Sequence, residues 1–198
     1  MEFVDLKAQY KELKTEIDAN IQKVLEHGRY LMGPEVGELE QQLAEYVGVK
    51  HCVTCANGTD ALHMVLMAWG IKKGDAVFVP TFTFMSTAEV VSLVGATPVF
   101  TDIDLKTFNM DAASLEQQIE KVIAEGTLTP KAIIPLDLFG QPTYYSTILP
   151  VAKKYHLLVL EDGSSGIGCN IHGNMAISFV VAASLTFLPA KSLGSIVR

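Results

Sequence analysis

The spacing of apolar residues predicts two helices in residues 1–50. Over Asp5–Glu26 the apolar positions recur at intervals of three and four, which is typical of one buried helix face. Gly28 follows that pattern and suits the left-handed conformation that often ends a helix. Pro34 then begins a second apolar stripe, which Gly48 closes in the same way. The chain is therefore expected to begin with an N-terminal helical segment.

After residue 50, short apolar runs alternate with amphipathic segments. The runs typical of buried strands are Cys52–Cys55, Ala76–Pro80, Pro98–Asp102, Ala132–Leu136, Leu157–Leu160 and Ala182–Phe187. The segments typical of helices are Asp60–Trp69, Ser86–Val94, Ala112–Glu125 after an Asp111 N-cap, and Ser146–Tyr155, which Pro150 is expected to kink. This alternation predicts an α/β fold of three layers (α/β/α) with a mostly parallel sheet. Ligands bind such sheets at the carboxyl ends of the strands.

Composition narrows the class of protein. The chain has 198 residues, is 49% hydrophobic, and carries 15 basic against 22 acidic residues, a net charge of −7. This hydrophobic fraction excludes disorder, and the acidic balance argues against a nucleic-acid groove. Three cysteines make no disulfide framework, and the N-terminus has no apolar signal-peptide core, so a cytoplasmic location is expected. The uncharged run 175–190 is shorter than the ~20 residues that span a bilayer, so no membrane association is expected.

Three places could carry chemistry. In the loop 56–61, Gly58 would let an anion approach free backbone N–H groups at a helix N-terminus, although an ordinary strand-to-helix turn explains the spacing equally well. Glu161 and Asp162 end an apolar strand, where a carboxylate can meet a ligand or simply cap the next turn. Lys191 follows an uncharged segment, which suits either a Schiff-base lysine or a surface side chain.

A cysteine and histidine pattern raises the alternative of a zinc site. Cys52 and Cys55 have the spacing of metal ligands, as do Cys169 and His172. In a strand, however, positions three apart point to opposite faces, so the first two thiols could not both reach one ion. We therefore expect buried, reduced thiols and no metal.

Taken together, these segments resemble the pyridoxal-phosphate-dependent nucleotide-sugar aminotransferases of the DegT/StrS kind. The likeness runs along essentially the whole chain. It rests on FVDLKAQY, GRYLMGPEVGELEQQLAEYVGVKH, CANGTDAL, PTFTFMSTAE, GATPVFTDID, AIIPLDLFGQP, VLED and FLPAKSLG. So many matches in order are far more specific than any one motif. The resemblance implies the large domain of fold-type I pyridoxal-phosphate transferases.

The resemblance also assigns roles. Lys191 would form the Schiff base with pyridoxal phosphate and move the proton during transamination. Asp162 would pair with the protonated pyridine nitrogen, which keeps the ring an electron sink, and Phe84 would stack on the ring. The remaining cofactor-binding residues would be Gly58 and Thr59 at the phosphate, Thr186 in place of the usual phosphate-binding serine, and Ser165 where the family has glutamine near the ring.

The same likeness implies a reaction. An amino acid donor, such as glutamate, would give its amino group to a keto-sugar nucleotide in surface-polysaccharide synthesis. The CANGTDAL loop resembles that of enzymes acting on UDP-linked 3-keto N-acetyl glucuronates. A sugar dehydratase of the same fold has histidine at the Schiff-base position, so Lys191 argues against it. A plain nucleotide-binding module would form no Schiff base at all. The partners implied are the sugar substrate, the amino donor and a second copy of the chain in a homodimer.

The length of 198 residues is shorter than the resemblance to this family would lead us to expect. Residues 1–198 match an incomplete large cofactor-binding domain, with the C-terminal small domain of the family absent. By resemblance, a further strand would lie between the Cys52–Cys55 run and the last strand, and without it two strands face a gap. We therefore expect cofactor binding without turnover by this chain alone. The alternative function is a non-catalytic remnant or fragment that keeps the fold.

Overall fold

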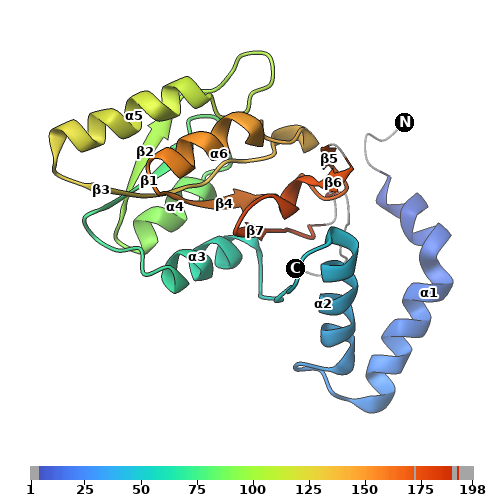
Figure 1. The fold of residues 1–198 in the computed structure, drawn as a ribbon. Coiled ribbons are helices and arrows are strands. Elements are labelled where there is room, and N and C mark those ends of the chain that lie inside the picture. The colour runs from blue at the N-terminus through green and yellow to red at the C-terminus, as the bar shows by residue number, and fades with distance from the viewer. Residues whose placement is uncertain (1–4, 172, 189–190, 192–198) are drawn as a thin grey trace.

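The computed structural model describes residues 5–171, 173–188 and 191 (Figure 1). Its centre is a parallel sheet of five strands in the order β2-β1-β3-β4-β7. The strands are β1 (Asp75–Pro80), β2 (Thr97–Thr101), β3 (Thr129–Ile133), β4 (Leu158–Asp162) and β7 (Ala182–Ser184). Because every pairing is parallel, all five carboxyl ends meet at one edge of the sheet.

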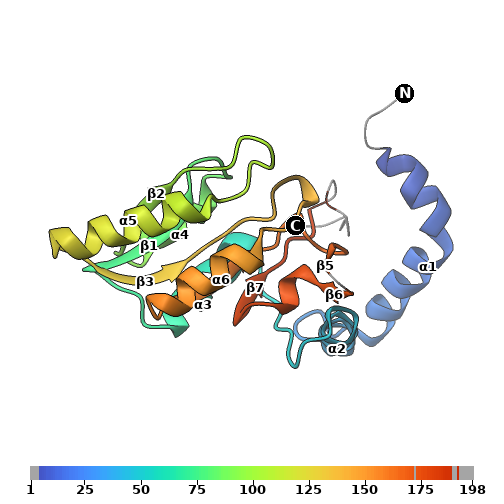
Figure 2. The same cartoon turned by 45° about the horizontal axis from the view of Figure 1, so that its top comes forward.

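Helices cover both faces of this sheet, as Figures 1 and 2 show. The covering helices are α3 (Gly58–Ala68), α4 (Ser86–Leu93), α5 (Ala112–Glu125) and α6 (Tyr145–Lys154). Asp111 caps α5 as predicted, since its side chain accepts a hydrogen bond from the Ser114 amide. Helix α6 continues across Pro150. The predicted three-layer α/β fold with a parallel sheet is confirmed.

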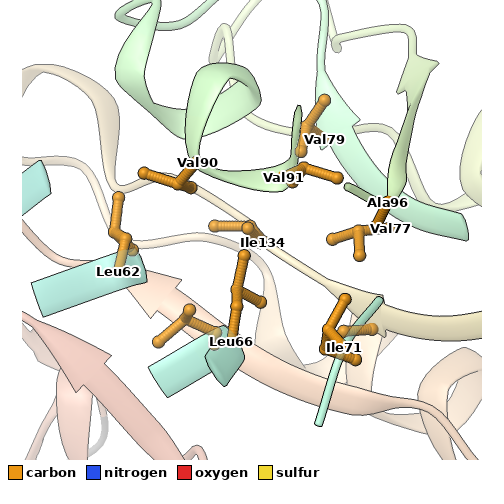
Figure 3. Close-up of a cluster of buried hydrophobic side chains, with 11 residues drawn as sticks. Leu62, Leu66, Ile71, Val77, Val79, Val90, Val91, Ala96 and Ile134 are labelled. Carbon is orange, nitrogen blue, oxygen red and sulfur yellow. The ribbon is translucent and has the colours of Figure 1, made fainter. Parts of the chain in front are cut away.

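The alternation of side chains along β1 builds two separate cores. Val77 and Val79 point to one face and join Leu62 and Leu66 of α3, in a cluster that also includes α4 (Figure 3). Phe78, between them in sequence, points to the other face and joins a second cluster made with α5 and α6. All three β1 residues are fully buried. A central strand that is buried on both faces has an unbroken run of apolar residues, so its position could be predicted from the sequence.

Two long helices precede this body. They are α1 (Leu6–His27) and α2 (Pro34–Val47), each followed by a glycine in the left-handed conformation, with φ +65° at Gly28 and +78° at Gly48. Both helices lie to one side of the sheet in Figures 1 and 2. No residue of α1 is buried. The apolar stripe that predicts this helix therefore faces solvent in the single chain.

The predicted strand at Cys52–Cys55 is wrong. Residues 51–55 form no strand. The backbone amide and the hydroxyl of Thr54 both donate hydrogen bonds to Glu40 Oε1 of α2, at 2.7 Å and 2.9 Å. In the described residues, β7 has β4 as its one neighbour and is an edge of the sheet. An extended segment becomes a strand only where another strand pairs with it. The segment 51–55 has the composition of a strand but no such partner.

The other boundaries differ by a few residues. Strand β3 begins at Thr129 rather than Ala132, and β7 ends at Ser184 rather than Phe187. After β4 the chain forms a small antiparallel pair, β5 (Asn170–Ile171) and β6 (Asn174–Met175), which the apolar pattern did not predict. Among the described residues, no helix is both long and apolar enough to cross a membrane.

Candidate functional site

Asp162 ends β4 at the carboxyl edge of the sheet and is almost fully buried. Its Oδ2 accepts a hydrogen bond of 2.8 Å from the hydroxyl of Thr87, a fully buried residue in the first turn of α4. Its Oδ1 has only a longer contact, 3.4 Å from the amide of Ser164. Oδ2 is therefore held in place by a hydrogen bond, and Oδ1 can still accept one. This is the arrangement that a ligand N–H requires.

Lys191 and Ser165, candidates from two different loops, lie in direct contact. Lys191 Nζ donates a hydrogen bond of 2.9 Å to Ser165 Oγ. Ser165 comes three residues after Asp162, and the parallel pairing of β4 with β7 brings the segments that follow both strands to the same edge. The predicted lysine and the predicted residue near the ring are thus brought together by the fold.

Gly58 and Thr186 form a second close pair. A Cβ built on Gly58 would overlap Thr186 Oγ1, so only glycine leaves room for this approach. Gly58 and Thr59 begin α3, where backbone N–H groups have no acceptor within the helix. The Asn57 side chain caps the turn by accepting from the Asp60 amide at 2.9 Å. Free amides beside a hydroxyl make a site suited to a phosphate group.

Phe84, a predicted site residue, has no partner side chain among the interactions of the described residues. It precedes α4 and is 74% exposed. An exposed aromatic ring at the carboxyl edge is free to cover a flat ligand, and the exposure itself carries an energetic cost that such a ligand would remove. Its position is compatible with the predicted stacking role, which stays a prediction.

Below this edge lies a buried acid pair that the sequence alone did not reveal. Glu161 and Asp162 are neighbours in β4, so they point to opposite faces, and Glu161 turns away from Thr87 toward Asp137. Both Glu161 and Asp137 are fully buried. Burial first, and then the charge of Asp137, raises the pKa of Glu161 to about 9. Both oxygens of Glu161 and Oδ2 of Asp137 are buried without another hydrogen-bond partner among the described residues. We expect a proton held by one of the two carboxyl groups to replace the repulsion between two charges with an attraction. The pairing comes from tertiary contact, so nothing in the local pattern signals it.

The cysteines considered as an alternative zinc site lie in other surroundings than the sequence predicted. Cys52 and Cys55 lie in the irregular segment 51–55, so the strand argument against joint metal binding does not apply to them. Cys55 is exposed rather than buried. Cys169 donates to the Gly140 carbonyl at 2.6 Å, and His172 lies outside the described residues. Within the described part of the chain, no three candidate ligands gather around a point.

The residues at this edge match the needs of pyridoxal phosphate. Gly58 and Thr59 offer helix N-terminal amides beside the Thr186 hydroxyl, Asp162 keeps an oxygen for a ring nitrogen, and Lys191 supplies an amine. A parallel α/β sheet that holds these groups at its carboxyl edge has the architecture of the large domain of pyridoxal-phosphate-dependent aminotransferases. The chain belongs to the DegT/DnrJ/EryC1/StrS aminotransferase family, whose model matches residues 11–196.

Individual relatives agree with this placement. A UDP-2-acetamido-2-deoxy-3-oxo-D-glucuronate aminotransferase from Pseudomonas aeruginosa is 46% identical over 194 residues, which is 98% of this chain and 52% of that protein. A DegT DnrJ EryC1 StrS aminotransferase from Brucella abortus superposes with a TM-score of 0.95 at 48% identity, over 100% of this chain and 53% of the other. DesV of S. venezuelae gives 0.91 at 34% identity, over 99% and 51%. The chain spans about half the length of the relatives it matches.

Proposed function

We propose that this chain holds pyridoxal phosphate for the transfer of an amino group from an amino acid, such as glutamate, to a keto-sugar nucleotide. The observation that carries the proposal is the hydrogen bond between Lys191 and Ser165 at the same sheet edge as Asp162. A lysine amine and a buried carboxylate at one sheet edge are the two groups that this chemistry needs. Family members use this cofactor, which supports the same assignment.

Each residue would have a distinct task. When bound, the cofactor supplies an aldehyde that links to amines and a ring that accepts electron density. Lys191 would provide the linking amine and later carry the proton to and from the reacting carbon. Asp162 would hold a proton on the ring nitrogen. The phosphate would lie against the amides of Gly58 and Thr59 and the hydroxyl of Thr186.

The remaining residues would position the ring. Phe84 would cover one face of it, and its exposed side chain would lose contact with water on doing so. Ser165 would orient the lysine through the hydrogen bond that it already accepts. These tasks are divided among segments that follow β1, β4 and β7, so the site depends on strands that are far apart in the sequence.

The preferred substrate is a UDP-linked 3-keto N-acetyl glucuronate. The support is the 46% identity to the Pseudomonas aeruginosa enzyme whose name states that substrate, over nearly all of this chain. That name belongs to the Pseudomonas aeruginosa enzyme, of which this chain covers 52%. The substrate therefore rests on likeness, whereas the cofactor site also rests on geometry.

The second candidate function is a non-catalytic chain that keeps the fold and weak cofactor binding. The observation that favours it is the open edge of β7 together with the unpaired segment 51–55, which flank the site. Both candidates predict a covalent link at Lys191. They differ in whether glutamate then converts the bound cofactor.

The deciding experiment combines spectroscopy with trapping. Purified protein mixed with pyridoxal phosphate should develop a visible absorption band, and borohydride should fix the cofactor on the peptide that contains Lys191. Lys191→Ala should abolish both signals, while Lys154→Ala, on the surface of α6, should change neither. Loss of the band on adding glutamate supports transamination, and a band that glutamate leaves unchanged supports the non-catalytic candidate. A native chain with no band would rule out the proposed function.

A further inference from the structure

Two threonine hydroxyls, one partly and one fully buried, lead from the segment before α4 to Asp162. Thr83 Oγ1 and Thr87 Oγ1 lie 2.8 Å apart, and Thr87 Oγ1 lies 2.8 Å from Asp162 Oδ2. A hydroxyl has a single proton to donate, and an ionised carboxylate can only accept. The direction is therefore fixed when Asp162 is charged: Thr83 donates to Thr87, and Thr87 donates to Asp162.

This contact is stronger than an ordinary side-chain hydrogen bond. Thr87 is fully buried and Asp162 is 4% exposed, so water does not compete for either group. A hydrogen bond to a charged acceptor is shorter and stronger than one between neutral groups, and a donor upstream strengthens it further. Thr87 is also held in a helix turn, since its amide donates to the carbonyl of Phe84. The donor is thus rigid, and it restricts rotation of the carboxylate.

The two oxygens of Asp162 are consequently not equivalent. Oδ2 is occupied by the hydroxyl of Thr87, and Oδ1 has only the 3.4 Å contact with the Ser164 amide. A ring nitrogen that approaches this carboxylate finds Oδ1 available in a fixed direction. Without the hydroxyl, the carboxylate could turn about its terminal torsion, which is broad for aspartate.

We infer that Thr87 is a positioning residue for the cofactor, because its hydroxyl fixes the carboxylate of Asp162 so that Oδ1 faces the ring nitrogen. The inference rests on the proposed function and adds a residue to it. The same short segment also carries Phe84, the residue proposed to cover the ring, so one turn at the start of α4 would align both the face and the nitrogen of the ring.

The test compares two ligands that differ only at the ring nitrogen. Dissociation constants are measured by equilibrium dialysis for pyridoxal phosphate and for its 1-deaza analogue, which has carbon in place of that nitrogen. The variants are Thr87→Val, which removes the hydroxyl at constant shape, and Thr87→Ser, which keeps it. Thr101→Val is the matched control, because Thr101 is equally buried and its hydroxyl binds a backbone carbonyl away from Asp162.

Thr87→Val should weaken binding of pyridoxal phosphate about tenfold, equivalent to ~1.4 kcal/mol, and leave binding of the deaza analogue unchanged. Thr87→Ser should bind both ligands as the native chain does, and Thr101→Val should lower neither affinity selectively. Equal weakening of both ligands by Thr87→Val would show a purely structural role and overturn the inference. Unchanged binding of both would overturn it as well.

Failure of the broader proposal gives a different result. If the native chain binds neither ligand, both the proposed cofactor function and the proposed role of Thr87 are wrong. If the native chain binds both ligands equally well, the cofactor proposal stands and only the inference about the nitrogen fails. Thr87→Ala replaces the valine variant if the latter does not fold, with thermal unfolding of each protein as the check.

Discussion

Lys191 and Ser165 are 26 positions apart in the chain, and the lysine amine donates a 2.9 Å hydrogen bond to the serine hydroxyl. The relationship places a side chain that follows β7 over the loop that follows β4. The contact gives the Ser165 hydroxyl a specific task, which is to orient the lysine amine. It also provides the first test of the site.

Removing the Ser165 hydroxyl should slow attachment of the cofactor to Lys191. In Ser165→Ala the lysine loses the acceptor that orients its amine, a loss of ~1 kcal/mol that corresponds to roughly a fivefold lower rate of borohydride-trappable linkage. Ser165→Thr keeps a hydroxyl and should react at a rate close to the native one. A native rate in the alanine variant would mean that the contact does not orient the amine.

A methyl group on Gly58 should damage the phosphate site selectively. In Gly58→Ala the new Cβ overlaps Thr186 Oγ1, so the loop and the hydroxyl must separate. We expect at least a tenfold rise in the dissociation constant for pyridoxal phosphate, measured by dialysis, with little change for pyridoxal, which has no phosphate. Gly37→Ala is the matched control, because nothing lies within 4 Å of its added Cβ and helix α2 should gain ~0.5–1 kcal/mol. An equal loss of affinity for pyridoxal phosphate and pyridoxal would mean that Gly58→Ala does not act on the phosphate site.

The buried acid pair predicts how stability depends on pH. The pKa of Glu161 is about 9 in the folded chain, against an ordinary value of 4.5. Between those values the folded state keeps a proton that the unfolded state releases, so the stability contributed by this group is full below pH 4.5 and is lost as pH rises toward 9. The free energy of unfolding should fall by up to ~1.4 kcal/mol per pH unit from this group.

Urea unfolding at several pH values between neutrality and 9 measures this dependence. Glu161→Gln keeps the shape and an N–H donor for Asp137 but cannot ionise, so its stability should vary less with pH than that of the native chain. Glu116→Gln is the control, because Glu116 pairs with Lys154 at the surface and its pKa is lowered rather than raised. Parallel pH curves for native and Glu161→Gln proteins would contradict the shared proton.

We also predict that the chain forms a homodimer through its N-terminal segment. Helix α1 buries none of its residues, and the loop that follows it exposes Tyr30, Leu31 and Met32 at 66%, 90% and 73%. So much exposed apolar surface is unusual in a monomer and is relieved by contact with another chain. Light scattering during gel filtration should give the mass of two chains for the native protein and of one for Leu31→Glu. A native monomer at micromolar concentration would contradict the prediction.

Much of the fold was predictable because its signals are local. The helix Ala112–Glu125 was predicted to the residue, since its aspartate cap and its terminal glycine both lie next to it in the sequence. Strand β1 was predictable because a strand buried on both faces must be apolar throughout. The segment 51–55 was mistaken for a strand for the same reason that β1 was identified: it has suitable side chains. Strand formation also needs a neighbouring strand, which side-chain pattern does not report.

Some residues of the candidate site could also be predicted from the sequence, and others could not. Its members Lys191, Asp162 and Gly58 could be chosen from the order of motifs, since each follows a predicted strand. Thr87, which is 75 positions from Asp162, was not predicted. Thr186 was placed near Gly58 by the family resemblance, because no local pattern joins two residues so far apart in the chain. Glu161 and Asp162 were considered together as carboxylates that either meet a ligand or cap a turn, whereas strand alternation sends Glu161 to the opposite face, toward Asp137.

The sequence by itself thus determined the fold class and the family and proposed the candidate site residues, because periodicity, capping and ordered motifs are properties of neighbouring positions. Tertiary structure alone decided which side chains touch: Thr87 with Asp162, Ser165 with Lys191, Thr186 with Gly58, and Asp137 with Glu161. Those contacts join segments that only the parallel pairing of strands brings to one edge, and burial in the fold raises the pKa of Glu161.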